Sequence, residues 1–214
     1  TFLSEDISLI GGHTTQGAEL TIGVTLLGDM RSKPTEISNA KIGDKIVLTK
    51  PIGTGVILAG EMQGLTSGQD LINALSWMQK SQSPLLEVTR KCNAMTDVTG
   101  FGLIGHLMNI CEASSVSASI SINKVPLLEG TIELVKKGVK STLFSENKGK
   151  NKNINMVEDP ALDLLFDPQT SGGMLISIPS KKIEDLQNHL TKSGLLSSVI
   201  GEIKQGKPSV LINK

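Results

Sequence analysis

The apolar positions that follow Gly100 recur at helical spacing. They are Phe101, Leu103, Ile104, Leu107, Met108, Ile110 and Cys111. Such a stripe predicts a helix that is buried on most of its sides. A short apolar run precedes this helix and contains one carboxylate, Asp97. We therefore expect Asp97 to lie between the end of a strand and the beginning of a buried helix.

This position allows two interpretations of Asp97. A carboxylate here can hold a metal ion while the backbone N–H groups and the dipole of the helix face an anion. Alternatively, Asp97 or Thr99 caps the helix by accepting one of its first N–H groups. Spacing alone favours the cap, because capping requires no other group.

Two further segments combine glycines with polar side chains. Residues 11–15 (Gly-Gly-His-Thr-Thr) follow an apolar stretch, and they either present bare N–H groups to an anion or form an ordinary loop. Residues 167–173 hold a carboxylate, an amide, two hydroxyls and two glycines. So many polar side chains and glycines in one short segment fit two interpretations equally well. The segment is either a tight backbone element with buried hydrogen bonds or part of a substrate pocket.

The remaining pattern predicts strands and helices without strict alternation. Strands are expected at 20–27, 45–49, 116–122, 174–178, 198–203 and 209–212, with the last two joined at Gln205-Gly206 as in a hairpin. Helices are expected at 56–62, 68–80, 126–137 and 161–166, and after Ser83 and Ser180. We therefore expect an α+β protein, in which a mixed sheet has helices packed on one face.

The stretch 148–153 is rich in lysine and asparagine. This composition predicts a mobile surface loop with solvated lysines. A lid that contacts phosphate is the alternative.

Composition excludes several classes of partner. The 21 basic residues balance the 21 acidic ones, and aromatic residues make up 2% of the chain, so neither charge nor stacking favours nucleic acid or a membrane surface. No apolar run reaches the roughly 20 residues of a membrane helix. Cys92 and Cys111 lack a CxxC arrangement, so we expect core thiols in a reducing, cytoplasmic protein.

The polar segment 28–34 is interrupted by Pro34, which predicts a domain boundary. The chain begins with Thr1 rather than Met, so we expect the natural protein to extend upstream. Without that upstream part, the predicted strand at 20–27 is expected to be flexible or to pair with another chain.

Three separated segments together resemble selenophosphate synthetases (selenide, water dikinases), in order and in approximate spacing. They are residues 9–14 (LIGGHT), 95–102 (MTDVTGFG) and 166–173 (FDPQTSGG). Residues 45–55 and 141–147 also resemble this family, so the likeness spans essentially the whole chain. The family belongs to the ATP-binding superfamily of aminoimidazole ribonucleotide synthetase.

The resemblance implies an N-terminal α/β domain that dimerises and holds most of the nucleotide site, followed by a C-terminal α+β domain. Residues 1–28 then correspond to the end of the first domain and residues 29–214 to the second. The catalytic Cys or Sec, the catalytic Lys and two metal-binding Asp residues are expected upstream of Thr1. We therefore expect this chain alone to be inactive.

The resemblance also implies a reaction in which ATP, selenide and water give selenophosphate, AMP and phosphate, with Mg²⁺ required. Gly11, Gly12 and His13 match the segment that contacts the nucleotide, and Asp97 matches a Mg²⁺ ligand. Asp167, Thr170 and Ser171 match a family signature and are candidates for a pocket. The full-length protein is expected to be a homodimer.

Two other interpretations stay open. The protein is a relative within the superfamily, such as a thiamine-monophosphate kinase or a ribonucleotide cyclo-ligase, or it is a non-catalytic paralogue that acts as a dimerisation or regulatory module. The segment 167–173 favours the selenium enzyme over the relatives.

Overall fold

The computed structural model describes residues 2, 5–29, 33–151, 154–155 and 157–214. The chain divides into two compact units, Thr1–Pro34 and Thr35–Lys214. No helix in the described ranges is long and apolar enough to cross a membrane.

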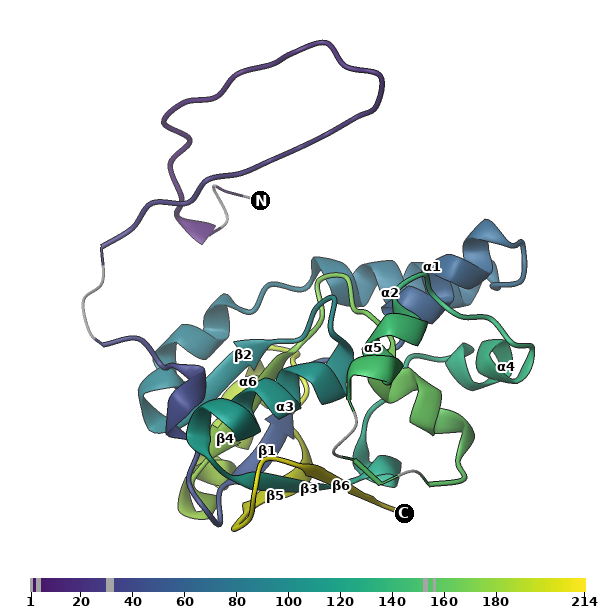
Figure 1. The fold of residues 1–214 in the computed structure, drawn as a ribbon. Helices are drawn as coiled ribbons and strands as arrows, with labels where there is room; N and C mark the ends of the chain where they lie inside the picture. Colours follow the sequence, from purple (N-terminus) through teal and green to yellow (C-terminus); the bar gives the residue numbers. More distant parts are fainter. Residues whose placement is uncertain (1, 3–4, 30–32, 152–153, 156) are drawn as a thin grey trace. The chain divides into compact units, whose positions relative to one another are not determined.

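A six-stranded sheet forms the centre of the second unit, with the order β2-β4-β1-β5-β3-β6 (Figure 1). Its strands are β1 (Lys45–Leu48), β2 (Ala94–Asp97), β3 (Ser117–Ser121), β4 (Met174–Ile178), β5 (Ser198–Lys204) and β6 (Val210–Asn213). Neighbouring strands are antiparallel except for β3 and β6, which are parallel. The predicted mixed sheet and α+β class are confirmed.

Among the described residues, six α-helices and several short 3₁₀ segments accompany the sheet. The helices are α1 (Thr54–Met62), α2 (Gly68–Gln79), α3 (Gly102–Ser114), α4 (Thr131–Lys136), α5 (Phe144–Lys150) and α6 (Ile183–Lys192). The two longest 3₁₀ segments are η3 (Ser83–Glu87) and η6 (Pro160–Phe166) in the part of the chain that the structure describes. The segments expected as helices after Ser83 and at 161–166 are thus 3₁₀ turns, and the helix expected at 126–137 is confined to α4.

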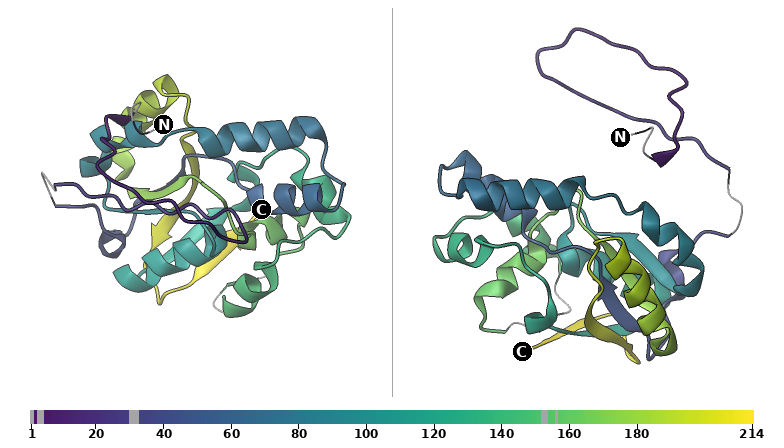
Figure 2. Two further views of the ribbon diagram at one scale, coloured as in Figure 1. Left: turned by 90° about the horizontal axis from the view of Figure 1, so that it is seen from above. Right: turned by 180° about the vertical axis from the view of Figure 1, so that it is seen from behind.

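Helical segments cover both faces of the sheet. The larger apolar cluster joins one face to α3, α1 and η6. Helix α6 lies on the other face (Figure 2). Its Leu186 and Leu190 pack against Val47, Ile176 and Ile178 of β1 and β4. The expectation of helices on one face therefore holds for the main helical layer. Helix α6 adds a second, smaller layer on the opposite face.

The apolar stripe after Gly100 forms α3, as predicted. Leu103, Ile104, Leu107 and Cys111 are buried in the main cluster. Phe101 differs, because it precedes the first helical residue and its side chain is 54% exposed. The buried stripe therefore begins at Leu103, two residues later than the sequence indicated.

The expected hairpin of the last two strands is wrong. Strand β3 lies between β5 and β6, and β6 pairs in parallel with β3. This pairing places Val210 and Ile212 in the main apolar cluster with Ala118 and Ile120. The alternation of apolar and polar residues in β6 fixes which face is buried, but not which strand is its neighbour.

The expected loop at 148–153 is also wrong in its first part, because α5 continues to Lys150. Phe144 is buried and anchors the helix. The ammonium of Lys148 lies 2.8 Å from Asp163, and Lys150 pairs with Glu146 one turn away at 2.5 Å. Both lysines therefore have carboxylate partners. Residues 152 and 153 lie outside the described residues.

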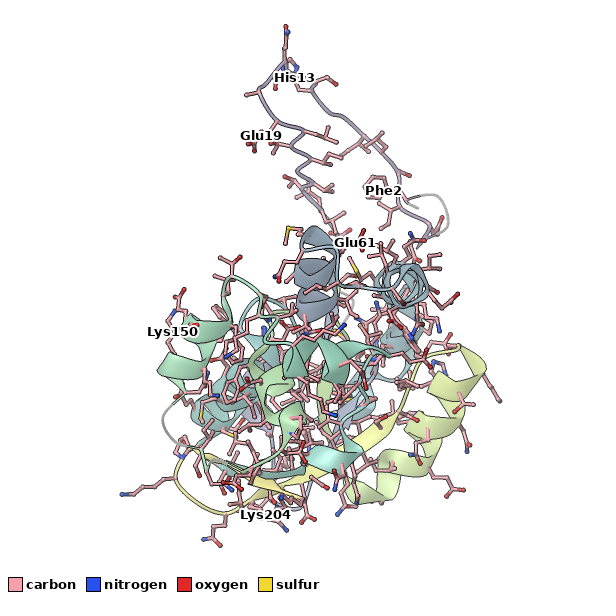
Figure 3. All side chains as sticks on the ribbon, turned by 90° about the vertical axis from the view of Figure 1, so that its right-hand side faces the viewer. Phe2, His13, Glu19, Glu61, Lys150 and Lys204 are labelled. Carbon is pink, nitrogen blue, oxygen red and sulfur yellow. The ribbon has the colours of Figure 1, made fainter. Side chains whose placement is uncertain are left out.

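The first unit contains no strand in its described residues, so the strand expected at 20–27 is wrong. The chain there is extended, and Leu20, Ile22 and Leu27 are 91, 79 and 83% exposed. A strand needs a hydrogen-bonded neighbour, and the backbone hydrogen bonds among the described residues of this unit join Glu5 and Ile7 to Phe2, far from 20–27. Figure 3 shows His13 and Glu19 on this extended part of the chain.

Candidate functional site

Three segments meet at one end of the sheet because β4 lies between β1 and β2 and runs antiparallel to both. The start of β4 therefore adjoins the ends of the other two strands. The N–H of Thr49 donates to Met174 O at 3.2 Å, and that of Val98 donates to Gly173 O at 2.9 Å. The segments 49–55, 96–102 and 167–173 thus form one cluster.

Asp97 is the last residue of β2 and its side chain is exposed. Among the described residues, no hydrogen bond or ion pair involves its carboxylate. The capping interpretation is wrong for Asp97 and for Thr99, because Phe101 occupies the N-cap of α3 and no side chain caps that helix. The carboxylate is therefore available to a ligand.

Asp167 has a different environment, because it is fully buried. Its carboxylate accepts hydrogen bonds from Val56 N at 3.1 Å, Ser141 Oγ at 2.9 Å and Gln169 Nε2 at 3.1 Å. Burial raises the pKa of Asp167 to about 6, and these donated bonds oppose the rise. Its oxygens are therefore used by protein donors, one of which is the Val56 N–H in the first turn of α1.

Gln169 completes the same arrangement. Its Oε1 accepts from Gly53 N at 2.9 Å, and from the N and Oγ1 of Thr54 at 3.1 Å each. Its Nε2 also donates to Asp167 O at 2.8 Å. Since the first N–H groups of a helix lack partners within the helix, Asp167 and Gln169 together cap α1 from a distant segment. Both residues therefore fit the first interpretation of the segment 167–173, which is a tight backbone element with buried hydrogen bonds.

Thr170 and Ser171 are exposed, unlike Asp167. The N–H of Thr170 donates to Thr54 Oγ1 at 2.9 Å, and Ser171 Oγ donates to Met78 O at 2.7 Å. Beside them, the buried Lys50 donates from Nζ to Ser171 O at 3.1 Å. Burial lowers the pKa of Lys50, and the nearby charge of Lys80 adds to this effect. Lys50 is therefore a core residue rather than a solvated one.

Gly172 allows the segment 167–173 to approach the turn after Asp97. A Cβ at this position would lie 2.2 Å from Val98 O. We expect Gly172→Ala to lower the free energy of unfolding by about 1–3 kcal/mol, because the clash is with backbone and cannot relax by a side-chain rotation. Urea denaturation measures the loss.

Gly149→Ala is the matched control, because no atom lies within 4 Å of its added Cβ. In the helix α5 this change should be neutral or stabilising by up to about 1 kcal/mol. Equal stability of Gly172→Ala and the wild type would contradict the close approach.

The raised pKa of Asp167 predicts a pH dependence of stability. Its value of about 6 exceeds the ordinary value of about 3.9, so the folded state binds more protons between these two pH values. The free energy of unfolding should therefore fall as the pH rises from about 4 to 6. Relative to Asp167→Asn, the wild type should lose on the order of 2–3 kcal/mol between pH 4 and 7. Urea denaturation at both pH values tests this, and a pH-independent difference would oppose it.

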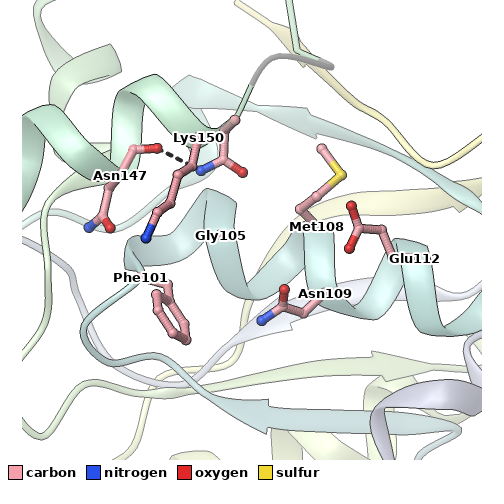
Figure 4. A pocket seen from close by; sticks show the side chains of 8 residues that line it. Phe101, Gly105, Met108, Asn109, Glu112, Asn147 and Lys150 are labelled. Carbon is pink, nitrogen blue, oxygen red and sulfur yellow. Dashed lines mark hydrogen bonds between the residues drawn. The ribbon is translucent and has the colours of Figure 1, made fainter.

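The hollow between α3 and α5 has a volume of about 240 Å³ (Figure 4). The exposed ring of Phe101 forms one wall, with Asn109 and Glu112 of α3 and Asn147 and Lys150 of α5 around it. The rings of Phe101 and His106 are 5.5 Å apart. The hollow therefore adjoins the first turn of α3.

Sequence reasoning missed His106 and Asn147, which both contact the turn between β2 and α3. His106 lies within the apolar stripe of α3, and its polarity is the one signal in the sequence that distinguishes it from its apolar neighbours. Asn147 belongs to the segment 141–147, which contributed to the resemblance without an assigned role.

Gly11, Gly12 and His13 are exposed residues of the first unit. The described residues of the chain contain no group of three or more His, Cys, Asp or Glu side chains that could hold a metal.

Comparison with known proteins identifies the second unit. Residues 41–213 match the family described as AIR synthase related protein, C-terminal domain. A selenide, water dikinase of Caldanaerobacter subterraneus subsp. tengcongensis is 35% identical over 205 residues, which cover 92% of this chain and 59% of that protein. The chain thus spans somewhat more than half the length of this relative.

Solved structures share the fold at low sequence identity. The thiamine-monophosphate kinase of Stenotrophomonas maltophilia superposes with a TM-score of 0.62 at 18% identity, over 83% of this chain and 52% of that protein. The hydrogenase maturation protein HypE in complex with ATP gives a TM-score of 0.58 at 16% identity, over 83% of this chain and 49% of that one.

Proposed function

The chain belongs to the family of AIR synthase related proteins, and we propose that it is the C-terminal part of an enzyme that makes selenophosphate from selenide, ATP and water. The products besides selenophosphate are AMP and phosphate. Two of the three segments that carry the resemblance, 95–102 and 166–173, lie together at one end of the sheet, around Asp97. The exposed carboxylate of Asp97 is the observation that supports the proposal most directly.

Asp97 fits the role of a Mg²⁺ ligand. Mg²⁺ in phosphoryl-transfer enzymes is held by one or two carboxylates together with phosphate oxygens and water, and the Asp97 carboxylate has no partner within the described residues. When bound, Mg²⁺ neutralises charge on the phosphates during transfer. Asp97 would then hold and orient the metal. The segment 167–173, which is hydrogen-bonded to Val98 and Thr99, keeps the end of β2 in place.

The remaining assignments follow the resemblance. We propose that Gly11, Gly12 and His13 contact the nucleotide, and that Thr170 and Ser171 face the pocket at the surface of the cluster. Residues 1–28 belong to the N-terminal domain and residues 29–214 form the C-terminal one. The intact enzyme is a cytoplasmic homodimer.

The products formed from ATP test this proposal. The full-length protein that contains this chain is incubated without oxygen with ATP, Mg²⁺ and selenide, and the nucleotides are separated by chromatography. We expect AMP to form only when selenide is present, and the 214-residue chain alone to form none.

Three outcomes would contradict the proposal. ADP formation with thiamine monophosphate as the acceptor would indicate a kinase of the related type. No ATP consumption by the full-length protein would favour a non-catalytic module. AMP formation from selenide by the 214-residue chain alone would show that upstream residues are not needed.

A further inference from the structure

The turn between β2 and α3 is held by side chains from two helices. From α3, His106 Nε2 accepts the N–H of Thr99 at 2.9 Å, and the hydroxyl of Thr99 lies 3.3 Å from the same nitrogen. Because a backbone N–H only donates, Nε2 must be unprotonated in this arrangement. Burial lowers the pKa of His106, against an opposing effect of Asp97, and this favours the neutral ring.

The second contact comes from α5. The Nδ2 of Asn147 donates to Gly100 O at 2.8 Å and to Phe166 O at 3.0 Å. Asn147 is 5% exposed, and Figure 4 shows it on α5 beside the first turns of α3. The side chain therefore ties the turn to the end of η6, which belongs to the main apolar cluster.

A third contact comes from the segment 167–173, where the N–H of Gln169 donates to Thr99 O at 2.9 Å. The N–H and C=O of Thr99 and the C=O of Gly100 thus have partners on three separate parts of the chain. The carboxylate of Asp97, two residues before Thr99, has none within the described residues. Its position is therefore set by the backbone of the turn rather than by contacts of its own.

We propose that His106 and Asn147 are positioning residues, which fix the turn at Thr99 and Gly100 and thereby place the Asp97 carboxylate for a divalent cation. This inference rests on the proposed function. Groups that orient a metal ligand without touching the metal typically change metal affinity by about 10–100-fold when they are removed. His106 and Asn147 act one step further away, through the backbone that carries the ligand.

Four variants of the full-length enzyme test the inference, with Mn²⁺ as the probe and a non-hydrolysable ATP analogue present. His106→Leu and Asn147→Leu remove the two contacts. His106→Gln places an amide oxygen where Nε2 lies, so it can still accept the N–H of Thr99. Asn109→Leu is the control, because Asn109 is an exposed residue of α3.

We expect His106→Leu and Asn147→Leu to raise the Mn²⁺ dissociation constant about tenfold, as measured by electron paramagnetic resonance. His106→Gln and Asn109→Leu should stay within about twofold of the wild type. Hydrogen exchange of the Thr99 amide should accelerate in His106→Leu and not in His106→Gln. Circular dichroism checks that each variant is folded, and Asn147→Leu decides the test if His106→Leu does not fold.

Wild-type Mn²⁺ affinity in a folded His106→Leu or Asn147→Leu variant would overturn the inference and leave the proposed function intact. In contrast, wild-type affinity in Asp97→Asn would remove Asp97 from the metal site. That result would count against the proposed function itself.

Discussion

Replacing Asp97 with Asn is expected to lower kcat/KM of the intact enzyme for ATP by about 100-fold or more, with little change in stability. The amide keeps the shape of the side chain but removes the negative charge that holds the metal. A metal ion contributes several kcal/mol to phosphoryl transfer, and a factor of 100 corresponds to about 2.7 kcal/mol. Initial rates of AMP formation at several Mg²⁺ concentrations measure the loss.

The exposed position of Asp97 makes this variant informative. Its side chain is at the surface, so its replacement does not disturb the core. Asp185→Asn is the matched control, because Asp185 is an exposed carboxylate of α6 that pairs with Lys91. It should retain activity within about twofold. A wild-type rate in Asp97→Asn would show that the carboxylate holds no essential metal.

Replacing Gln169 with Leu should cause the largest loss of stability, about 3–5 kcal/mol in the free energy of unfolding. The change leaves the N–H groups of Gly53 and Thr54 without their acceptor at the beginning of α1. It also removes the two hydrogen bonds that Gln169 Nε2 donates to Asp167. Unpaired polar groups in a buried site lose their hydration without compensation. Urea denaturation of the 214-residue chain measures the effect.

Gln79→Leu controls for the change of residue type, because Gln79 is an exposed residue at the end of α2. Its effect should stay within about 0.5 kcal/mol. Equal stabilities of the two variants would show that Gln169 does not cap α1.

Elements with a strong local pattern could be predicted from the sequence. The apolar stripe of α3 is continuous and buried from Gly102 to Cys111, except at Asn109. In β3, serines alternate with Ala118 and Ile120, and these two apolar residues are in the core. In both elements, the period of the apolar positions alone determines which face is buried.

Pairing and capping depended on distant residues and could not be predicted in this way. The neighbour of β6 is β3, about ninety residues earlier, and nothing within β6 specifies this choice. The N-terminus of α1 is capped by Gln169, 116 residues beyond Gly53. The stretch after Phe144 has the composition of a loop, and the burial of Phe144 together with the ion pairs of Lys148 and Lys150 makes it helical.

The candidate site could likewise be predicted only in part from the sequence. The motifs identified the segments that meet at the end of the sheet, and they identified Asp97 as a possible ligand. They did not separate the exposed Asp97 from the buried Asp167, because both are single carboxylates in short polar segments that contain glycines. Only the packing of the segment 167–173 against α1 distinguishes a free carboxylate from a capping one.

Phosphorus NMR of the reaction products tests the central claim most directly. The full-length enzyme and its Asp97→Asn variant are each supplied with ATP, Mg²⁺ and selenide enriched in the spin-½ selenium isotope. We expect the wild type to form a product whose phosphorus signal is split by selenium, together with AMP and phosphate, and the variant to form it about 100-fold more slowly or less. No phosphorus–selenium coupling in the wild type, or the same rate in both proteins, would contradict a selenophosphate-forming site at Asp97.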